Sequence, residues 1–234
     1  MKSLNNVAVI QVRTGSKRLP RKSLIKLKGL RIIDWVIKRT KKTSLIDNII
    51  LVTTKKKEDK IFSKIGKKYK IKVFYGEETN VLKRFCDVAK KYNIKNIVRI
   101  CADRPFISSD FLDSLILFFK RNKCDLAFNH VSEKKYKFKC IDGFGAEIFS
   151  AKTLNQIQYK TKNKKNLEHV TKYFYLNNKY KVKPAPLKKI FKKTKISLDL
   201  DTVEDLKFLE KLVKKNKIKI YTKPEQIVKA TANV

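Results

Sequence analysis

The chain reads VAVIQV at residues 7–12 and continues directly into RTGSKRLPRK at residues 13–22. The first stretch is apolar apart from Gln11, and a short run without polar alternation is typical of a strand buried on both faces. The second stretch contains five cations, no acid and Gly15. Backbone N–H groups and cations in such a loop suit phosphate oxygens. This stretch therefore predicts a buried strand that opens into an anion-binding loop.

Outward from this stretch, apolar runs alternate with segments of helical periodicity. The runs predict strands at residues 7–12, 48–53, 72–75, 96–101, 124–128, 144–149 and 196–200. Apolar residues at helical spacing predict helices at residues 31–43, 56–69, 79–92, 108–122, 166–177 and 203–214. Strands that alternate with helices predict an α/β protein with a largely parallel sheet and helices on both faces.

The length of 234 residues and the hydrophobic content of 42% suit one domain, residues 1–234, with a substantial core. The segment at residues 129–190 is less regular than the rest of the chain. We expect it to make an excursion from the main sheet, as a lid or as a dimer contact.

Composition argues against several classes of protein. No apolar run approaches the roughly 20 residues that a membrane-spanning helix needs, and the first residues lack a secretory signal, so we expect a soluble cytoplasmic protein. The four cysteines form no CxxC pair, which argues against a zinc site. The formal charge of +37 predicts a polyanionic partner. Because the excess is lysine spread over the whole chain, we interpret it as solvated faces and do not expect nucleic acid.

Polar residues stand at the end of the first strand and of the strand at residues 96–101. Thr14, Ser16 and nearby N–H groups can donate hydrogen bonds to phosphate oxygens, while Gly15 permits a backbone conformation barred to other residues. Asp103 follows the later strand, where an acid is a natural Mg²⁺ ligand. The competing interpretations are an ordinary solvated basic loop and a helix cap, although Ser108 already fills the cap position.

A cluster of acids follows near the end of the chain, in SLDLDTVEDL at residues 197–206. Asp199 and Asp201 point to the same face if residues 196–200 form a strand, because side chains alternate along a strand. Asp201 stands just before the cap of the next helix and is the better metal ligand. Since ligands bind outside the carboxyl ends of strands in such sheets, Asp103 and Asp201 are expected to converge.

Several segments together resemble those of the sugar cytidylyltransferases. RTGSKRLPRK resembles the signature RxGSxRLPxK of that family, and VRICADRP at residues 98–105 and DTVEDL at residues 201–206 resemble two more of its segments. Further matches are GEETNVLKR at residues 76–84, GFGAEIF at residues 143–149 and EHVT at residues 168–171. The resemblance spans almost the whole chain. It is nearest to the branch of a spore coat polysaccharide biosynthesis protein, related to the acylneuraminate and 3-deoxy-manno-octulosonate cytidylyltransferases.

The resemblance implies a three-layer α/β/α nucleotidyltransferase fold with a mostly parallel but mixed, Rossmann-like sheet. It implies that a sugar of the acidic type attacks the α-phosphate of CTP and that pyrophosphate leaves. It also implies Mg²⁺ as the cofactor, CTP and the sugar as partners, and a homodimer, since relatives are often dimers.

Roles for individual residues follow from the same resemblance. Catalysis would fall to Lys22, Arg13 and Asp103, and the metal ion would be held by Asp103 and Asp201. The sugar would be contacted by Arg104, Glu147 and His169. The nucleotide would be bound by Gln11, Arg13, Thr14, Gly15, Ser16, Arg18, Lys22, Asn80, Arg84, Ala102 and Asp103.

Departures from the family pattern leave the substrates open. Arg104 replaces a small residue, and Asn80 replaces an aspartate near the expected base pocket. One alternative is a sugar-1-phosphate nucleotidyltransferase that uses another NTP, and a second is a basic nucleic-acid-binding protein. His130 is interpreted as a structural residue.

Overall fold

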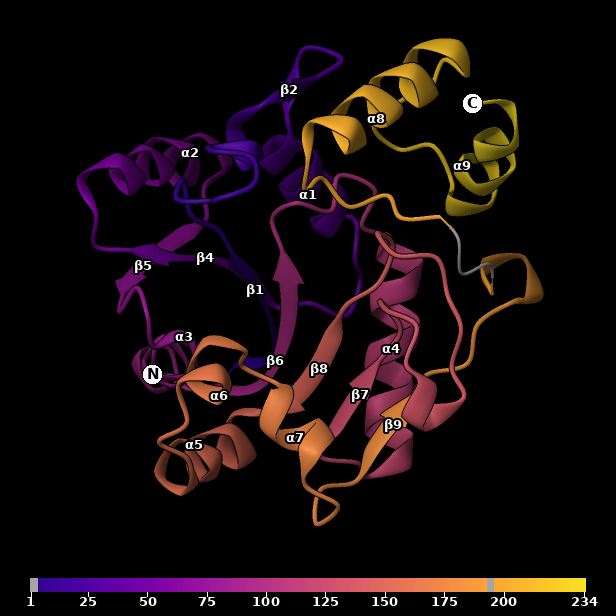
Figure 1. The fold of residues 1–234 in the computed structure, drawn as a ribbon. Helices are drawn as coiled ribbons and strands as arrows, with labels where there is room; N and C mark the ends of the chain where they lie inside the picture. Colours follow the sequence, from indigo (N-terminus) through magenta and orange to yellow (C-terminus); the bar gives the residue numbers. More distant parts are fainter. Residues whose placement is uncertain (1–3, 193–195) are drawn as a thin grey trace.

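The computed structural model describes residues 4–192 and 196–234. Within these residues, seven strands form the main sheet in the order β5–β4–β1–β6–β8–β7–β9 (Figure 1). Their bounds are β1 Leu4–Gln11, β4 Asn48–Thr54, β5 Lys72–Gly76, β6 Ile94–Cys101, β7 Leu126–Phe128, β8 Glu147–Ser150 and β9 Val182–Pro184. β8 pairs antiparallel with β6 and β7, and the other pairings are parallel. The mostly parallel but mixed sheet predicted from the sequence is confirmed.

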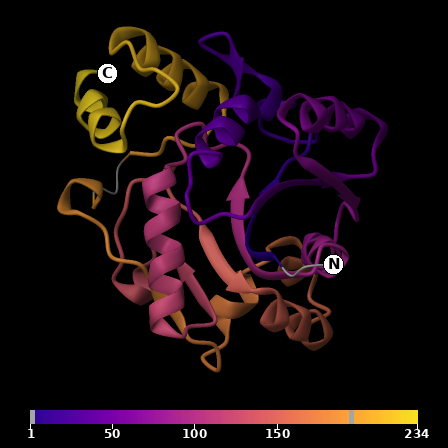
Figure 2. The ribbon, with the colours of Figure 1, turned by 180° about the vertical axis from the view of Figure 1, so that it is seen from behind.

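Helices cover both faces of this sheet. Their bounds are α1 Ile32–Thr40, α2 Ile61–Tyr69, α3 Val81–Lys91, α4 Ser109–Asn122, α5 Ala151–Lys160, α6 Lys164–Glu168, α7 Lys172–Leu176, α8 Val203–Lys215 and α9 Pro224–Ala230. Short 3-10 helices lie at Lys22–Leu24, Lys57–Lys60, Lys134–Tyr136, Lys189–Phe191 and Thr231–Asn233. The buried clusters place α1, α2 and α4 on one face and α3, α5 and α7 on the other. Figure 2 shows the face that carries α1 and α4. The three-layer α/β/α fold is confirmed.

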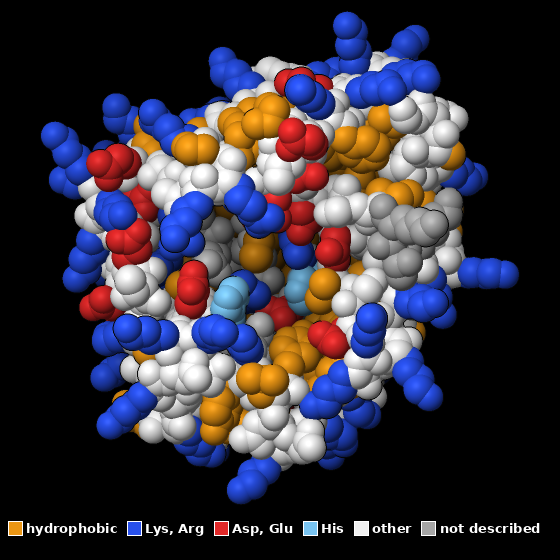
Figure 3. Space-filling view, in the orientation of Figure 1, with side chains coloured by type: hydrophobic (Ala, Val, Ile, Leu, Met, Phe, Trp, Pro, Cys, Tyr) orange, Lys and Arg blue, Asp and Glu red, His pale blue; other side chains and the backbone are white. Residues whose placement is uncertain are grey.

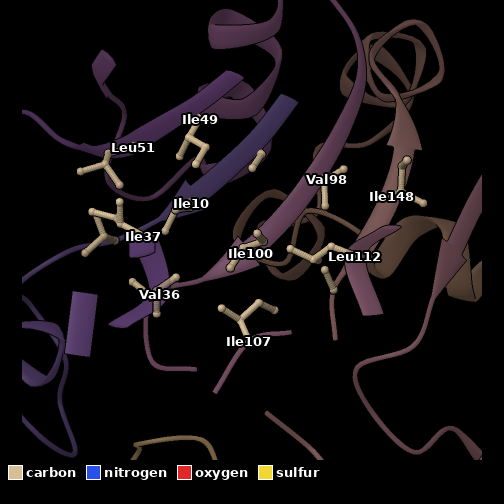
Figure 4. Packing of buried hydrophobic residues seen from close by; sticks show 14 of the residues in the cluster. Ile10, Val36, Ile37, Ile49, Leu51, Val98, Ile100, Ile107, Leu112 and Ile148 are labelled. Carbon is tan, nitrogen blue, oxygen red and sulfur yellow. The ribbon is translucent and has the colours of Figure 1, made fainter. Parts of the chain in front are cut away.

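The first strand is buried on both faces, as its unbroken apolar run predicts. Ala8 and Ile10 pack with the α1, α2 and α4 side, while Val7 and Val9 pack with the α3 side, and all four are fully buried. Figure 4 shows Ile10 beside Val36, Ile37 and Ile100, which come from α1 and the neighbouring strand β6. Burying one such side chain contributes about 1.5–3 kcal/mol, so this layer anchors the strand from which the cationic loop departs.

The order of the strands places that loop at a reversal of the sheet. The chain runs from β1 outward to β4 and β5, and then returns to the other side of β1 as β6. Loops that leave β1 and β6 consequently diverge at their carboxyl ends, which is where open α/β sheets bind ligands. The residues that follow these two strands are therefore the ones to examine for chemistry.

Two predictions near the end of the chain are wrong in detail. Residues 196–200 do not form a strand of the sheet, because only an isolated bridge joins Ser197 to Asp142. Leu198 and Leu200 instead pack with α8 and α9 in a third buried cluster. The predicted helix at residues 166–177 is broken into α6 and α7, because His169 between them adopts an extended backbone conformation with φ of −102° and ψ of 90°.

The structure also contains elements that the sequence pattern did not predict. The helices α5 and α9 are two of them, and a small hairpin of β2 Lys26–Leu27 and β3 Leu30–Arg31 is a third. The two turn residues of this hairpin, Lys28 and Gly29, both adopt positive φ angles, of 50° and 79°. Such a turn matches the twist of paired strands, and Gly29 adopts it without strain.

Residues 129–190 contribute β8 and β9 to the main sheet as well as α5, α6 and α7. The segment is therefore partly built into the sheet, and its role as a lid or dimer contact stays a prediction. None of the helices among the described residues combines the length and the apolarity needed to cross a bilayer. All four cysteines are free.

Candidate active site

The cationic loop begins at the end of β1 and is held from below by a buried carboxylate. Asp59, in the 3-10 helix after β4, accepts hydrogen bonds at 2.8 Å from both the backbone N–H and the hydroxyl of Thr14. Its other oxygen accepts from the backbone N–H and the hydroxyl of Thr54, at 3.3 and 2.5 Å. Although burial opposes its charge, these hydrogen bonds from Thr54 and Thr14 lower the pKa of Asp59. Asp59 thus ties the start of the loop to the neighbouring strand.

Lys22 joins the far end of the loop to two carboxylates from distant parts of the chain. Its ammonium nitrogen lies 2.5 Å from an oxygen of Asp103 and 2.7 Å from an oxygen of Asp201. The Arg18 guanidinium adds a contact of 2.8 Å to the second oxygen of Asp201. Burial opposes the charge of Lys22, but the two aspartates raise its pKa, so the ammonium is fully charged at neutral pH.

Asp103 and Asp201 converge although residues 196–200 are not a strand. The backbone N–H of Leu200 donates to the carbonyl of Asp103 at 2.8 Å, which draws the two segments together. Asp205 then accepts hydrogen bonds from the backbone N–H groups of Asp201 and Thr202, at 2.9 and 2.8 Å, as α8 begins. The convergence predicted from the sequence is present, but a backbone contact and a capping box produce it.

These two carboxylates form a donor set that suits one divalent cation together with a nucleotide. Among residues 4–192 and 196–234, no group of three or more His, Cys, Asp and Glu side chains converges on a point that would hold a metal. Mg²⁺ is commonly bound through one or two carboxylates with phosphate oxygens and water completing its shell. Asp103 and Asp201 share one ammonium in this structure, so their oxygens are close enough to act on a single ion.

A cavity of about 480 Å³ opens beside the loop. Figure 3 shows the hollow at the centre of one face of the molecule, with blue cationic side chains above it and red acidic and pale blue histidine side chains in and around it. The described residues that line the cavity are Gln11, Val12, Arg13, Gly15, Ser16, Lys17, Arg18, Lys22, Ser23, Glu78, Cys101, Ala102, Asp103 and Glu168. Most of the residues predicted to bind nucleotide therefore surround one space.

Three of the predicted nucleotide residues do not line this cavity. The hydroxyl and N–H of Thr14 are engaged by Asp59, so Thr14 fixes the loop. Asn80 caps α3 by accepting a hydrogen bond from the N–H of Lys83 at 2.8 Å. Arg84 is completely buried and donates to the carbonyls of Glu77 and Glu78, at 2.7 and 3.0 Å, so it supports the segment before α3.

Gly15 lines the cavity, but it does not adopt the backbone conformation that the sequence led us to expect. Its φ angle is not in the left-handed region, and a Cβ atom at this position would meet nothing within 4 Å. The left-handed residue of the loop is Arg21, with φ of 56°. The expected special conformation of Gly15 is thus absent, and its missing side chain leaves open space beside the cavity.

The three residues predicted to contact the sugar differ in burial: Arg104 and Glu147 are buried, and His169 is exposed. Arg104 is buried, with its guanidinium 3.1 Å from Asp199 and 3.3 Å from the carbonyl of Gly145. Glu147 is buried at the start of β8 beside Arg99, whose guanidinium lies 2.6 Å away. His169 is exposed, between α6 and α7. Arg104 and Glu147 are therefore engaged by protein groups, whereas His169 remains accessible.

Sequence reasoning missed Asp59, and it did not connect His130 with the site. Both follow strands of the sheet at the carboxyl end, Asp59 five residues after β4 and His130 two residues after β7. Their position was the signal that could have found them, because polar residues after the carboxyl end of any strand are candidates for the site, whether or not a motif stands beside them. Burial lowers the pKa of His130 to about 3, so its ring is neutral at physiological pH.

An α/β protein with a cationic loop and converging carboxylates at the reversal of its sheet has the layout of a nucleotidyltransferase. Residues 7–227 match the cytidylyltransferase family, and the chain belongs to that family. It is accordingly a nucleotidyltransferase enzyme.

Individual relatives agree with this assignment. An uncharacterised protein of Methanocaldococcus jannaschii is 36% identical over 209 residues, which are 89% of this chain and 83% of the relative. The spore coat polysaccharide biosynthesis protein SpsF of Bacillus subtilis is 29% identical over 215 residues, 88% of this chain and 85% of SpsF. The solved structure of a cytidylyltransferase from Leptospira borgpetersenii has a TM-score of 0.84 at 25% identity, and the match covers 99% of this chain and 94% of that one.

Proposed function

We propose that the enzyme transfers CMP from CTP to a hydroxyl group of a sugar and releases pyrophosphate. The sugar oxygen forms a bond to the α-phosphorus, the bond from that phosphorus to the bridging oxygen breaks with its electron pair on the departing pyrophosphate, and the proton of the hydroxyl passes to water. The observation that carries this proposal is the ammonium of Lys22 shared by Asp103 and Asp201 at the cavity. It brings a cation suited to phosphate oxygens and two carboxylates suited to a divalent ion to one point.

The loop residues supply positive charge to the part of CTP that departs. Arg13, Arg18 and Lys22 line the cavity and would neutralise the β- and γ-phosphates. Ser16 and the backbone N–H groups of the loop would donate hydrogen bonds to the same oxygens. Displacement at phosphorus depends mainly on positioning and on charge stabilisation, and a loop tied down by Asp59 provides both.

Asp103 and Asp201 would hold Mg²⁺, which supplies a Lewis acid at the α-phosphate when it is bound. For this to happen, the ammonium of Lys22 must leave the carboxylates. The triphosphate offers it an alternative partner of the same charge. Lys22 would therefore exchange its two aspartates for phosphate oxygens as the nucleotide enters, and the carboxylates would become free for the cation.

The destination of the product and the cellular setting are part of the same proposal. Similarity to SpsF of Bacillus subtilis supports a CMP-sugar made for surface polysaccharide. We place the reaction in the cytoplasm and assign a homodimer, with residues 129–190 as the contact. Light scattering at several protein concentrations tests the dimer, and a monomeric mass throughout would remove it.

The nucleotide is tested with a panel of CTP, UTP, GTP and ATP. Only CTP with Mg²⁺ should raise the melting temperature, because only a ligand bound to the folded state stabilises it, and only CTP should release pyrophosphate when sugars are added. If another NTP raises the melting temperature and releases pyrophosphate, the enzyme is a sugar-1-phosphate nucleotidyltransferase that uses that NTP in place of CTP. Nucleic acid that binds tightly at about 0.15 M salt, with no response to any NTP, would replace the proposal with the nucleic-acid-binding alternative.

The role of the carboxylates is tested with a matched pair of substitutions. Asp103→Asn should reduce turnover by at least about a hundredfold, as expected for loss of a charge that acts on the transition state. Asp110→Asn makes the same chemical change at an exposed position in the first turn of α4 and should leave turnover unchanged. Equal activity of the two variants would show that Asp103 does not hold the metal.

A further inference from the structure

A second cavity, of about 280 Å³, shares none of its described lining residues with the cavity beside the cationic loop. Its walls come from the end of α1, the start of α4 and the segment before α9, on the face of the molecule seen in Figure 2. Pockets for drug-sized ligands commonly measure about 300–1,000 Å³, so the second cavity suits a small ligand.

The wall of the second cavity contains a buried cation that no carboxylate neutralises. Arg39, near the end of α1, lines the cavity and is only 5% exposed. Its Nε donates to the carbonyl of Ile107 at 2.6 Å, and its Nη1 donates to the carbonyls of Ile220 and Thr222, at 2.7 and 3.2 Å. Within the part of the chain that the structure describes, Arg39 forms no ion pair and its Nη2 donates to no protein group. Arg39 thus joins two backbone segments with two of its nitrogens and keeps the third for another partner.

The missing counter-charge has a cost. Burial lowers the pKa of Arg39 to about 10, because the charged form loses hydration that the protein replaces only in part. The guanidinium is still charged at neutral pH. Carbonyl oxygens carry partial negative charge, so the three carbonyls around Arg39 offset a share of its charge and leave the rest. An anion in the second cavity would supply that remainder.

The other polar groups of this wall are mostly cations and hydrogen-bond donors. Lys42 and Lys223 are exposed, and neither forms an ion pair among the described residues. The hydroxyls of Ser108 and Thr222 each accept a hydrogen bond from a backbone N–H, at 3.5 and 2.8 Å, so each still has its own hydrogen to donate. Among the described residues of the wall the one acid is Asp110, which is exposed and pairs with none of these cations.

We propose that the second cavity binds a small oxyanion of the phosphate type, with positive charge supplied by Arg39, Lys42 and Lys223. Ser108 and Thr222 would donate hydrogen bonds to its oxygens. Three cations against one acid leave an excess of positive charge on the wall, which suits a doubly charged tetrahedral anion better than a singly charged planar carboxylate. The site lies apart from the one proposed for transfer of CMP, so the inference does not rest on that reaction.

The inference is tested by ¹H–¹⁵N NMR of the labelled protein during titration with inorganic phosphate. Sodium chloride of equal ionic strength is the reference, because it screens charges to the same extent. The Nε–H signal of Arg39 and the backbone N–H signals of Ser109 and Asp110 should shift and saturate with phosphate and not with chloride. Pyrophosphate, which the proposed reaction releases, is titrated in a second arm. The anion with the lower dissociation constant at these signals identifies the source of the phosphate group.

A pair of double substitutions then tests the lysines. Lys42→Gln combined with Lys223→Gln should weaken phosphate binding at these signals by about tenfold, because two exposed cations are lost. Lys120→Gln combined with Lys229→Gln changes the net charge equally at exposed positions of α4 and α9 outside the second cavity. This control should leave the dissociation constant unaltered.

Three results would overturn the inference. They are shifts confined to Gly15 and Ser16 of the cationic loop, shifts that chloride reproduces, and equal weakening of phosphate binding in the two double variants. If the Lys42 and Lys223 variant loses its melting transition, the titration of the unsubstituted protein decides. The titration contains no nucleotide and no sugar, so its result stands whether or not CTP is the substrate.

Discussion

Replacing Lys22 with methionine should increase the affinity of the nucleotide-free protein for Mn²⁺, a spectroscopic substitute for Mg²⁺. In the structure the ammonium of Lys22 contacts both carboxylates that would bind the ion, at 2.5 and 2.7 Å. A metal ion must displace it, and removing the ammonium removes that cost. Methionine keeps a chain of similar length without the charge.

The size of the effect follows from the two contacts. Hydrogen bonds to charged groups contribute about 1.5–3 kcal/mol when buried. The side chains of Lys22, Asp103 and Asp201 are 17%, 20% and 35% exposed, so solvent screening reduces each contact. About 1 kcal/mol for each gives about 2 kcal/mol together, which corresponds to roughly a 30-fold lower dissociation constant. Affinity for CTP should fall in the same variant, because a phosphate-binding cation is lost.

The assay is electron paramagnetic resonance of free Mn²⁺ during titration, with and without CTP. Lys17→Met is the matched control, since Lys17 is an exposed cation of the same loop and lines the same cavity. It changes the net charge equally but leaves the carboxylates paired with Lys22. The reasoning is refuted if Lys22→Met leaves Mn²⁺ affinity unchanged, or if Lys17→Met raises it as much.

Two further predictions concern buried groups near the site. Asp59→Asn removes one of the acceptors for Thr14 and Thr54 and should destabilise the fold by about 2 kcal/mol, roughly 4–8 °C in melting temperature, with a higher KM for CTP. Asp87→Asn, in an exposed pair with Lys83, should change the melting temperature little, and similar shifts in both variants would contradict the special role of Asp59. His130 has a folded pKa of about 3, below the value of about 6.5 in the unfolded chain, so stability should fall as pH drops from about 6.5 toward 3, by up to about 1.4 kcal/mol per pH unit from this group. His130→Gln should flatten urea-unfolding stability over that pH range, and an unchanged slope would show that the ring is not neutral in the fold.

The sequence was most informative where one physical cause acts locally. The strand at residues 7–12 is apolar because both faces of β1 are covered, and the helices that cover it show the matching periodicity. The position of the loop then follows from the rule that ligands bind at the carboxyl ends of parallel strands. For this reason the fold and the position of the loop could be predicted without coordinates, whereas Asp201 reaches Asp103 through the backbone contact of Leu200 and not from a strand of the sheet.

Contacts between distant segments were beyond the reach of such patterns. Thr14 looked like a phosphate donor, but Asp59, 45 residues away, takes both of its donors. Leu198 and Leu200 looked like strand residues, yet they are buried against α8 and α9 and pair with no strand ladder. In each case the sequence shows correctly that the side chain is apolar or forms hydrogen bonds. Its role depends on the group that it contacts in the fold, which the sequence pattern does not reveal.

The total charge illustrates the same limit at the scale of the whole protein. A formal charge of +37 suggests a site that attracts anions by excess cation. At the site, however, Lys22 and Arg18 are paired with Asp103 and Asp201, and Arg99 is paired with Glu147. Cationic side chains project around the outline of the face in Figure 3, where they are solvated. Long-range attraction can speed the arrival of CTP, but selection at the site depends on which ion pairs each substrate group can replace. A triphosphate can replace the carboxylate partners of the loop, because its oxygens offer Lys22 and Arg18 the same charge as Asp103 and Asp201.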